Sequence, residues 1–239
     1  MSFEVRAVSK AFGSTELFRN LSLSFGLESI TVILGPSGSG KTTLLNMLAG
    51  TLAADEGGIS LPGSVSYLFQ EPRLLPWRSV ERNLEFVLPQ AMPKAERRER
   101  VQSMLGMVEL YEFRHQLPGL LSGGMRQRAA LARAFIYPSS VLLMDEPFQA
   151  LDLSLKLSLV DAFRLLWERD RRGVVFVTHD IQESVLLADR ILVFSKPVTR
   201  VVDDFTVDIP RSERFLGHEA LLGLERRLYT DLTGRHYGR

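Results

Sequence analysis

A glycine-rich segment near the N-terminus constrains the fold of this chain more than any other feature. It reads Gly35, Pro36, Ser37, Gly38, Ser39, Gly40, Lys41 and Thr42, which matches G-x-x-x-x-G-K-[ST]. Apolar residues 30–34 precede it, and residues 41–49 follow with leucines on one helical face. Glycines let successive backbone N–H groups curl around phosphate oxygens, and a helix start adds a favourable dipole. The segment therefore predicts a phosphate-binding loop, with Lys41 on the β- and γ-phosphates and Thr42 on Mg²⁺.

Two carboxylates follow a second apolar stretch. Residues 141–144 read as a buried strand, and Asp145 and Glu146 come directly after it. The carboxyl ends of parallel strands line the crevice in which α/β proteins bind ligands. Beside a phosphate loop, Asp145 is expected in the shell of the magnesium ion, and Glu146 is expected to polarise an attacking water. Without the loop, an ordinary strand end in solvent would explain the pair equally well.

The pattern of short apolar runs predicts an α/β fold. Residues 30–34, 141–144 and 174–178 have the length and β-branching of buried parallel strands, and each precedes a helical pattern. Residues 3–8, 17–25, 58–61 and 65–69 read as shorter strands. These four predict an N-terminal antiparallel layer on a P-loop NTPase core with a parallel sheet.

The remainder of the chain predicts two further parts of one domain spanning residues 1–239. Residues 72–130 are expected to form an inserted α-helical subdomain, in which the charged run 94–100 is a solvated helix face. Residues 195–239 form a short C-terminal extension with a strand pattern at 198–207 and a helical pattern at 219–232.

Composition excludes several classes of protein. The 239 residues include 29 Lys and Arg against 28 Asp and Glu, so the net charge of +1 gives no reason to expect nucleic acid as a partner. The absence of cysteine excludes a disulfide scaffold, a thiolate metal site and a cysteine nucleophile. No apolar run approaches the ~18 residues of a membrane span, and the N-terminus has no secretory pattern. If the protein works at a membrane, another chain is expected to provide the spans.

One further motif makes a resemblance specific. Residues 121–128 read Leu-Ser-Gly-Gly-Met-Arg-Gln-Arg, which resembles the signature motif of ATP-binding cassette (ABC) ATPases. Ser122, Gly123 and Gly124 open a predicted helix, whose N–H groups form an anion site. The resemblance implies that two copies face each other and that each offers this helix end to the γ-phosphate bound by the other. Taken alone, a Ser-Gly-Gly helix start would mostly be a cap.

Other residues fall at matching positions of the family. Gln70 resembles the glutamine that senses Mg²⁺ and the membrane subunit, Asp152 resembles the D-loop aspartate, and His179 resembles the switch histidine on the γ-phosphate. Phe12 occupies the position of the aromatic residue that stacks on adenine, where the family often has Tyr; a core Phe is the alternative. The resemblance thus implies an ATP site that comprises the eight loop residues together with Phe12, Thr43, Ser122, Gly123, Gly124 and Asp152. Its catalytic residues are Glu146, His179 and Gln70, and its magnesium ligands are Thr42, Gln70 and Asp145.

Two stretches, residues 69–77 and 178–190, are similar to the nitrate, sulfonate and taurine importer ATPases. That similarity implies the ATP-hydrolysing subunit of a bacterial importer, peripheral on the cytoplasmic face of the inner membrane. It would act as a dimer of identical or different cassettes, with a membrane permease and, indirectly, a solute-binding protein. Residues 73–77 are expected either at the permease interface or in the core of the helical subdomain. Gln149 departs from the small residue usual in the family, which is expected to alter packing at the dimer seam.

Three alternative functions stay open at this stage. A soluble ABC ATPase of DNA repair or translation usually carries a coiled-coil insertion or tandem cassettes, and this chain has neither. An exporter subunit would share the same motifs. A small-molecule P-loop kinase would not need residues 121–128. The sequence does not name the transported molecule, because the ATPase does not touch it.

Overall fold

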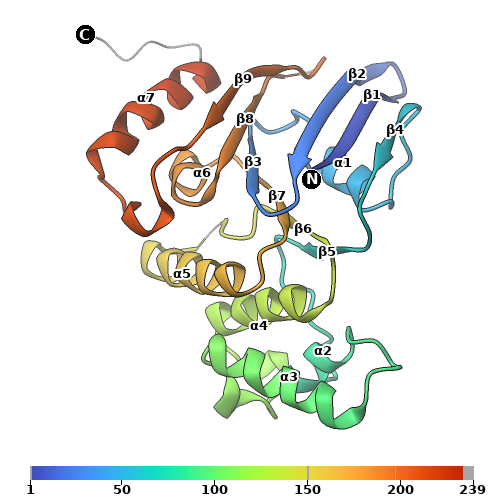
Figure 1. Ribbon diagram of the computed structural model, residues 1–239, viewed down its shortest axis with the longest axis vertical. Coiled ribbons are helices and arrows are strands. Elements are labelled where there is room, and N and C mark those ends of the chain that lie inside the picture. The colour runs from blue at the N-terminus through green and yellow to red at the C-terminus, as the bar shows by residue number, and fades with distance from the viewer. Residues whose placement is uncertain (1, 150, 197, 234–239) are drawn as a thin grey trace.

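Two β-sheets form the upper part of the molecule in Figure 1, and the computed structural model describes residues 2–149, 151–196 and 198–233. The larger sheet has the strand order β5-β6-β7-β3-β8-β9, and the smaller sheet has the order β2-β1-β4. The strands are β1 (Ser2–Phe12), β2 (Thr15–Gly26), β3 (Ile30–Leu34), β4 (Glu56–Ser60), β5 (Val65–Leu68), β6 (Val141–Asp145), β7 (Gly173–Thr178), β8 (Arg190–Phe194) and β9 (Val201–Thr206). The larger sheet is parallel from β5 to β8, and the smaller one is antiparallel. The expected α/β class with an antiparallel layer is therefore confirmed.

Strand β3 lies in the middle of the larger sheet because both of its faces are apolar. Val32 and Leu34 contribute to one hydrophobic cluster, whereas Ile33 contributes to the other. Alternate side chains of a strand point to opposite faces, so a strand buried on both sides needs the unbroken apolar run seen in the sequence.

Helices cover the two faces of the larger sheet. The helices are α1 (Lys41–Leu48), α2 (Val80–Glu85), α3 (Lys94–Met107), α4 (Gly123–Ile136), α5 (Leu153–Arg169), α6 (Ile181–Leu187) and α7 (Glu219–Thr233), of which α2 and α3 pack against α4. Helix α1 and the smaller sheet share one hydrophobic cluster with the larger sheet. Helices α4, α5, α6 and α7 share the other cluster, on the opposite face.

The strand predicted at residues 65–69 was assigned to the wrong sheet. The sequence placed it in the antiparallel layer, but β5 (Val65–Leu68) pairs in parallel with β6 at the edge of the larger sheet. Because it follows the predicted strand at residues 58–61 after a short gap, the two together look like a hairpin in the sequence. The choice of partner instead depends on a strand some 75 residues further along the chain, where Val65 lies opposite Val141.

The segment expected to be a helical subdomain contains α2, α3, α4 and two 3₁₀ turns, Tyr111–Phe113 and Pro118–Leu120. Helices α2 and α3 form the lowest part of the molecule in Figure 1, beneath α4. The fully buried Asn83 on α2 organises the chain that leads into this part. Its amide donates to the carbonyl of Leu75 at 3.2 Å, and its oxygen accepts from the N–H of Leu75 at 2.7 Å.

The C-terminal extension is fastened to the body by a buried arginine. Arg214 is only 4% exposed and donates to the carbonyl oxygens of Val207, Ile209, Val185 and Ala188. Burial lowers the pKa of its guanidinium to about 10. The extension was predicted to run to residue 239, and its last six residues lie outside the described part.

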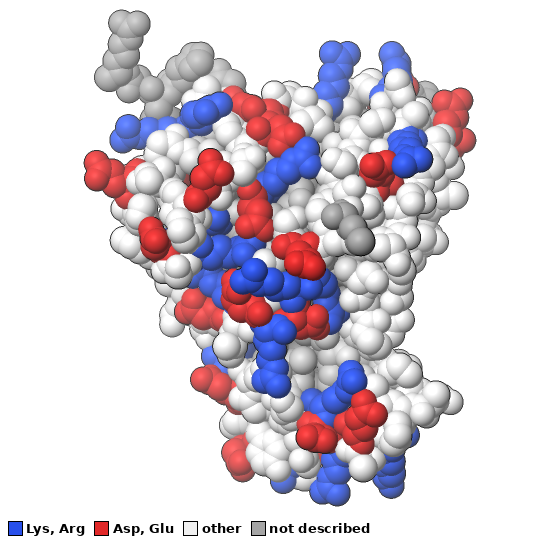
Figure 2. All heavy atoms as spheres, viewed as in Figure 1, with Lys and Arg blue, Asp and Glu red and all other residues white. Residues whose placement is uncertain are grey.

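The surface carries charges of both signs. Figure 2 shows acidic and basic side chains interspersed on the face in view, in keeping with the net charge of +1. In the described ranges, no helix combines the length and the apolar character that crossing a bilayer requires.

The packing of α5 gives a test of the core. Phe163 is fully buried and meets Phe135 of α4 edge-on, with ring centroids 5.8 Å apart. We expect Phe163→Ala to lower the free energy of unfolding by about 3–5 kcal/mol, because it removes buried area and leaves a cavity. Leu165→Ala on the same helix is the control, since that side chain is 54% exposed. Urea denaturation measures both, and equal losses would contradict the assignment of α5's inner face.

Candidate active site

The ends of four parallel strands bring the predicted site together. The phosphate loop leaves β3, Asp145 ends β6, His179 follows β7 and Gln70 follows β5. In the sheet, β6 and β3 both pair with β7. Parallel pairing puts the carboxyl ends of all these strands on the same side of the sheet. Residues separated by more than a hundred positions in the sequence therefore become neighbours.

Lys41 lies inside the phosphate loop. Its ammonium donates to the carbonyl oxygens of Gly35 at 2.7 Å and Pro36 at 3.1 Å, and the residue is 6% exposed. Burial lowers its pKa, against the opposing effect of the carboxylates of Glu146 and Asp145. The loop therefore holds one desolvated cation next to two acids.

Two glycines of the loop need conformations that other residues rarely adopt. Gly38 has φ 81° and Gly40 has φ 82°. A Cβ on Gly40 would also lie 2.6 Å from the ring of Phe18. Helix α1 begins directly after Gly40 with no side-chain cap, so its first N–H groups are directed to the open side of the loop.

Asp145 is held by two hydroxyl groups. Thr42 Oγ1 donates to its Oδ1 at 3.0 Å, and Tyr67 Oη on β5 donates to its Oδ2 at 3.2 Å. Burial raises the pKa of Asp145, and the two hydrogen bonds oppose that rise. Burial likewise raises the pKa of Tyr67, with the carboxylate of Asp145 adding to the effect. The tyrosine therefore stays a donor at neutral pH.

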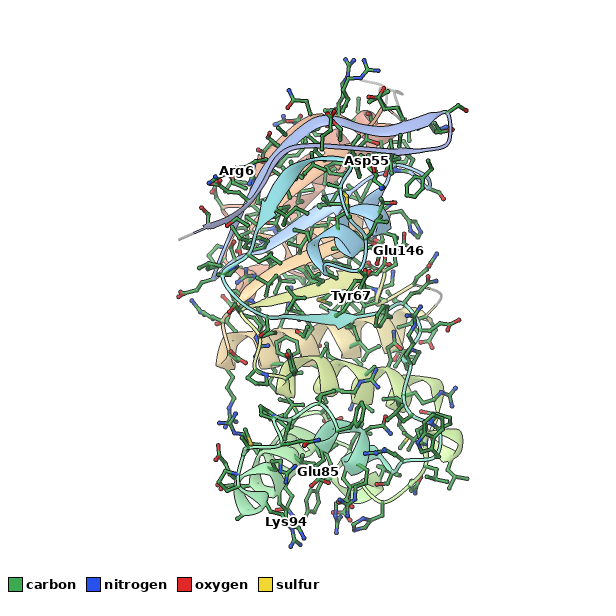
Figure 3. All side chains as sticks on the ribbon, turned by 90° about the vertical axis from the view of Figure 1, so that its right-hand side faces the viewer. Arg6, Asp55, Tyr67, Glu85, Lys94 and Glu146 are labelled. Carbon is green, nitrogen blue, oxygen red and sulfur yellow. The ribbon has the colours of Figure 1, made fainter. Side chains whose placement is uncertain are left out.

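Glu146 lies between a cation and a histidine. Its Oε1 is 4.0 Å from Lys41 Nζ, and its Oε2 is 2.9 Å from His179 Nδ1. Its backbone has φ 45°, a left-handed conformation uncommon for a residue with a side chain. The N–H of Glu146 donates to Val177 O at 3.0 Å, which fixes this turn against β7. Tyr67 and Glu146 are labelled below helix α1 in Figure 3.

A pocket of about 270 Å³ opens beside the phosphate loop. The residues that line it are Phe12, Leu17, Ser37, Gly38, Gly40, Lys41, Thr42, Thr43 and Glu146. Phe12 is 52% exposed, so it is not the core residue that the alternative interpretation required. Asp55 accepts from Lys10 Nζ at 2.6 Å and Ala11 N at 2.7 Å, which holds the strand end that carries Phe12 (Figure 3).

Gln70 contacts the residue that departs from the family pattern. Its amide donates to Gln149 Oε1, and its carbonyl accepts from Gln127 Nε2 at 3.2 Å. The same Gln127 amide donates to Pro147 O at 2.7 Å. Gln149 thus bonds to Gln70 within one chain, whereas the sequence predicted an effect at the dimer seam.

The signature residues lie apart from the loop of their own chain. Ser122 caps α4 and accepts from Met125 N at 3.3 Å, and neither it, Gly123 nor Gly124 lines the described pocket. A Cβ on Gly124 would meet Leu155 Cδ1 at 2.4 Å, so this glycine allows α4 and α5 to touch. Asp152 caps α5 by accepting from Leu155 N at 3.0 Å.

Sequence reasoning missed the residues that support the site. Tyr67 was only part of a predicted strand, and Gln127 was only one letter of the signature motif. No local pattern marks either residue, because each acts on a partner distant in sequence. The rings of Tyr67 and Phe69 stack with centroids 4.2 Å apart, a contact that is likewise seen only in the structure.

Comparisons with known proteins agree on one family. Residues 18–149 match the family described as ABC transporter. The chain is 42% identical to the aliphatic sulfonates import ATP-binding protein SsuB 1 of Paracoccus denitrificans, over 95% of this chain and 92% of that one. It is 37% identical to SsuB of Rhodopseudomonas palustris, over 97% and 83% of the two chains.

A solved structure supports the same assignment. The ATP-binding cassette MJ0796, in a dimeric post-hydrolysis state with bound ADP and Pi, has a TM-score of 0.74 and 29% identity, covering 88% of this chain and 100% of that one. The parallel sheet, with the phosphate loop and the acidic residues at the carboxyl ends of its strands, defines the class of P-loop ATPases. Within that class, this chain belongs to the ATP-binding subunits of ABC transporters, and its expected activity, ATP hydrolysis coupled to transport, is confirmed at the level of the family.

Proposed function

We propose that this protein is the ATPase subunit of an importer of aliphatic sulfonates. The observation that carries the proposal is the meeting of Lys41, Thr42, Asp145, Glu146 and His179 at one edge of the sheet. The sulfonate class follows from relatives that bear that name and match nearly the whole chain. Residues 1–239 would act as one nucleotide-binding domain, with the helical subdomain at about 72–130 and the extension at about 195–239.

ATP would bind with its phosphates in the loop and its adenine on Phe12. The donors of the loop and the first turn of α1, with the ammonium of Lys41 beside them, match the charge of the phosphates. Thr43 and Ser37 line the same pocket. Ser39 Oγ is buried without a hydrogen-bond partner, and it offers one more polar group within the loop.

The residues present also fit a magnesium ion. Thr42 Oγ1 and Asp145 Oδ1 lie 3.0 Å apart, and a hydroxyl and a carboxylate are the oxygen ligands that Mg²⁺ takes alongside phosphates. Gln70 follows the adjacent strand and would complete the set. When bound, the ion would neutralise charge that develops on the phosphates.

Glu146 would act as the general base for the attacking water. His179 Nδ1 lies 2.9 Å from its carboxylate and would hold it while its own ring faces the γ-phosphate. The left-handed backbone of Glu146 directs this carboxylate towards Lys41 rather than along the strand.

The second half of each site would come from a second cassette. Ser122, Gly123 and Gly124 open a helix outside the pocket of their own chain, so their N–H groups suit a γ-phosphate held by the partner. Asp152, at the start of α5, would lie at the same seam.

The membrane partner would dock on the segment that follows Gln70. Trp77 is 72% exposed and Phe86, directly after α2, is 57% exposed, and aromatic residues of this kind are enriched at protein interfaces. The protein would then lie on the cytoplasmic face of the cell membrane beneath its permease, with a solute-binding protein delivering the sulfonate from the other side.

Tyr67 provides a test of the metal site. Tyr67→Phe removes one hydrogen bond to Asp145, worth about 1 kcal/mol, so we expect the Mg²⁺ concentration for half-maximal ATPase activity to rise about fivefold. Tyr137→Phe, on a tyrosine outside the site, is the control. An unchanged Mg²⁺ dependence in Tyr67→Phe would contradict the role given to Asp145.

Ser122→Arg tests whether the site is shared. We expect the variant to bind ATP with near-normal affinity, because Lys41 and Thr42 are untouched. It should lose ATP-driven dimerisation and hydrolysis, because the arginine fills the space of the partner's γ-phosphate. Nucleotide titration, size-exclusion chromatography and phosphate release measure the three properties.

Mixing sharpens that test. Lys41→Ala should lose most of its nucleotide affinity, and each mixed dimer with Ser122→Arg contains one site with both lesions and one with neither. Recovery of hydrolysis on mixing would support a site shared across the dimer. Normal hydrolysis by Ser122→Arg alone would refute the shared site.

Uptake in the native host tests the transport role. Cells that lack this chain should fail to take up a labelled alkanesulfonate and to grow on it as sole sulfur source. Restoring the chain should restore both, and Glu146→Gln should not, because its amide cannot accept a proton. Growth on sulfate is the control. Unimpaired sulfonate uptake without the chain would overturn the substrate assignment and leave the ATPase assignment standing.

A further inference from the structure

A partly buried ion cluster lies next to His179. Lys156 Nζ on α5 is 2.5 Å from Asp180 Oδ2 and 2.9 Å from Glu183 Oε1 on α6. Glu183 is 2% exposed, and its side chain points into the body of the protein. None of these three residues touches the pocket beside the phosphate loop, so the proposed mechanism gives them no part.

The cluster fixes the peptide that carries His179 from both sides. On one side, Thr178 Oγ1 donates to Glu183 Oε2 at 2.7 Å. On the other, Asp180 N donates to Thr178 Oγ1 at 3.1 Å, and Asp180 Oδ1 accepts from Glu183 N at 3.1 Å. His179 thus lies between two residues that both depend on Glu183, with its ring 2.9 Å from Glu146.

The ammonium of Lys156 stabilises the buried carboxylate of Glu183. Burial disfavours its charged form, but the hydrogen bonds to Asp180 and Glu183 outweigh that effect and raise its pKa. Removing one member of a buried ion pair leaves the other charge without compensation, which is more costly than replacing both. Without Lys156, the carboxylate of Glu183 has to take up a proton or move, and either change weakens the hydrogen bond that it accepts from Thr178.

The same lysine also belongs to the start of α5. Its N–H donates at 2.9 Å to the carbonyl oxygen of Asp152, the residue that caps the helix. Leu155, its neighbour, packs on Gly124 of the signature helix. Lys156 therefore connects the segment expected at the dimer seam with the segment that holds His179.

We propose that Lys156 and Glu183 are positioning residues that set the distance between His179 and Glu146 and make it depend on the position of α5. The proposal rests on the function given above. It assigns to the pair a role in turnover, not in nucleotide binding, since neither residue reaches the pocket.

Steady-state kinetics provide the first test. We expect Lys156→Met to lower kcat on the order of tenfold, the size of effect that a small misplacement of a catalytic group produces, with KM for ATP within about twofold. Lys156→Arg, which can still pair with both acids, should restore most of kcat. Lys94→Met on the exposed start of α3 is the matched control and should change neither constant.

A double variant separates positioning from stability. Lys156→Met should lower the melting temperature, because it leaves Glu183 unpaired in the interior. In Lys156→Met/Glu183→Gln no charge is left unpaired at residue 183, so the melting temperature should recover while kcat stays low. Recovery of kcat together with the melting temperature would overturn the proposal in favour of a purely structural cluster.

The histidine itself supplies a readout that does not depend on activity. The chain has four histidines, so imidazole NMR signals can be assigned with His179→Ala. Lys156→Met should shift the signal of His179 and leave the others in place, and Lys94→Met should shift none. An unmoved His179 signal would overturn this proposal and leave the proposed function standing. Full ATPase activity of His179→Ala would instead refute the role of His179 in the proposed function.

Discussion

The in-register parallel pairing of β7 with β3 and β6 is the constraint on which the site depends. Leu34 lies opposite Thr178, and Asp145 lies opposite Val177, so the last residues of three strands end at one level. A slip of one residue would exchange the two faces of a strand and bury its polar end in the core. Because both faces of these strands are apolar and enclosed, the register is fixed by the same packing that stabilises the domain.

The site concentrates ionisable groups in a place where water is scarce. Burial disfavours the charged forms of both Lys41 and Asp145, which lowers one pKa and raises the other. Each group gains from a partner of opposite charge, and in the proposed function nucleotide phosphates with a divalent cation would supply that compensation on both sides. Burial therefore disfavours the charge on two of the groups that would bind ATP.

Local patterns in the sequence predicted the phosphate loop, Asp145 and Glu146, because each needs particular residue types at fixed spacing. The resemblance to a family added Gln70, His179 and the signature residues, and their assigned roles stay predictions. The contacts that the sequence did not reveal join residues that lie far apart along the chain. Tyr67 reaches Asp145 across two paired strands, and the strand that carries it was assigned to the wrong sheet for the same reason. Pairing between strands is decided by packing over the whole domain, not by the few residues of one segment.

Helix α6 is held at both ends by charged groups. Lys156 binds its first turn, and Arg214 binds the carbonyls of Val185 and Ala188 at its last turn. It has only seven residues, too few for it to bend between these anchors. Through these contacts, α6 connects the C-terminal extension with the peptide that carries His179. A change in the position of Arg214 would therefore act on α6, whose first residue lies two positions after His179.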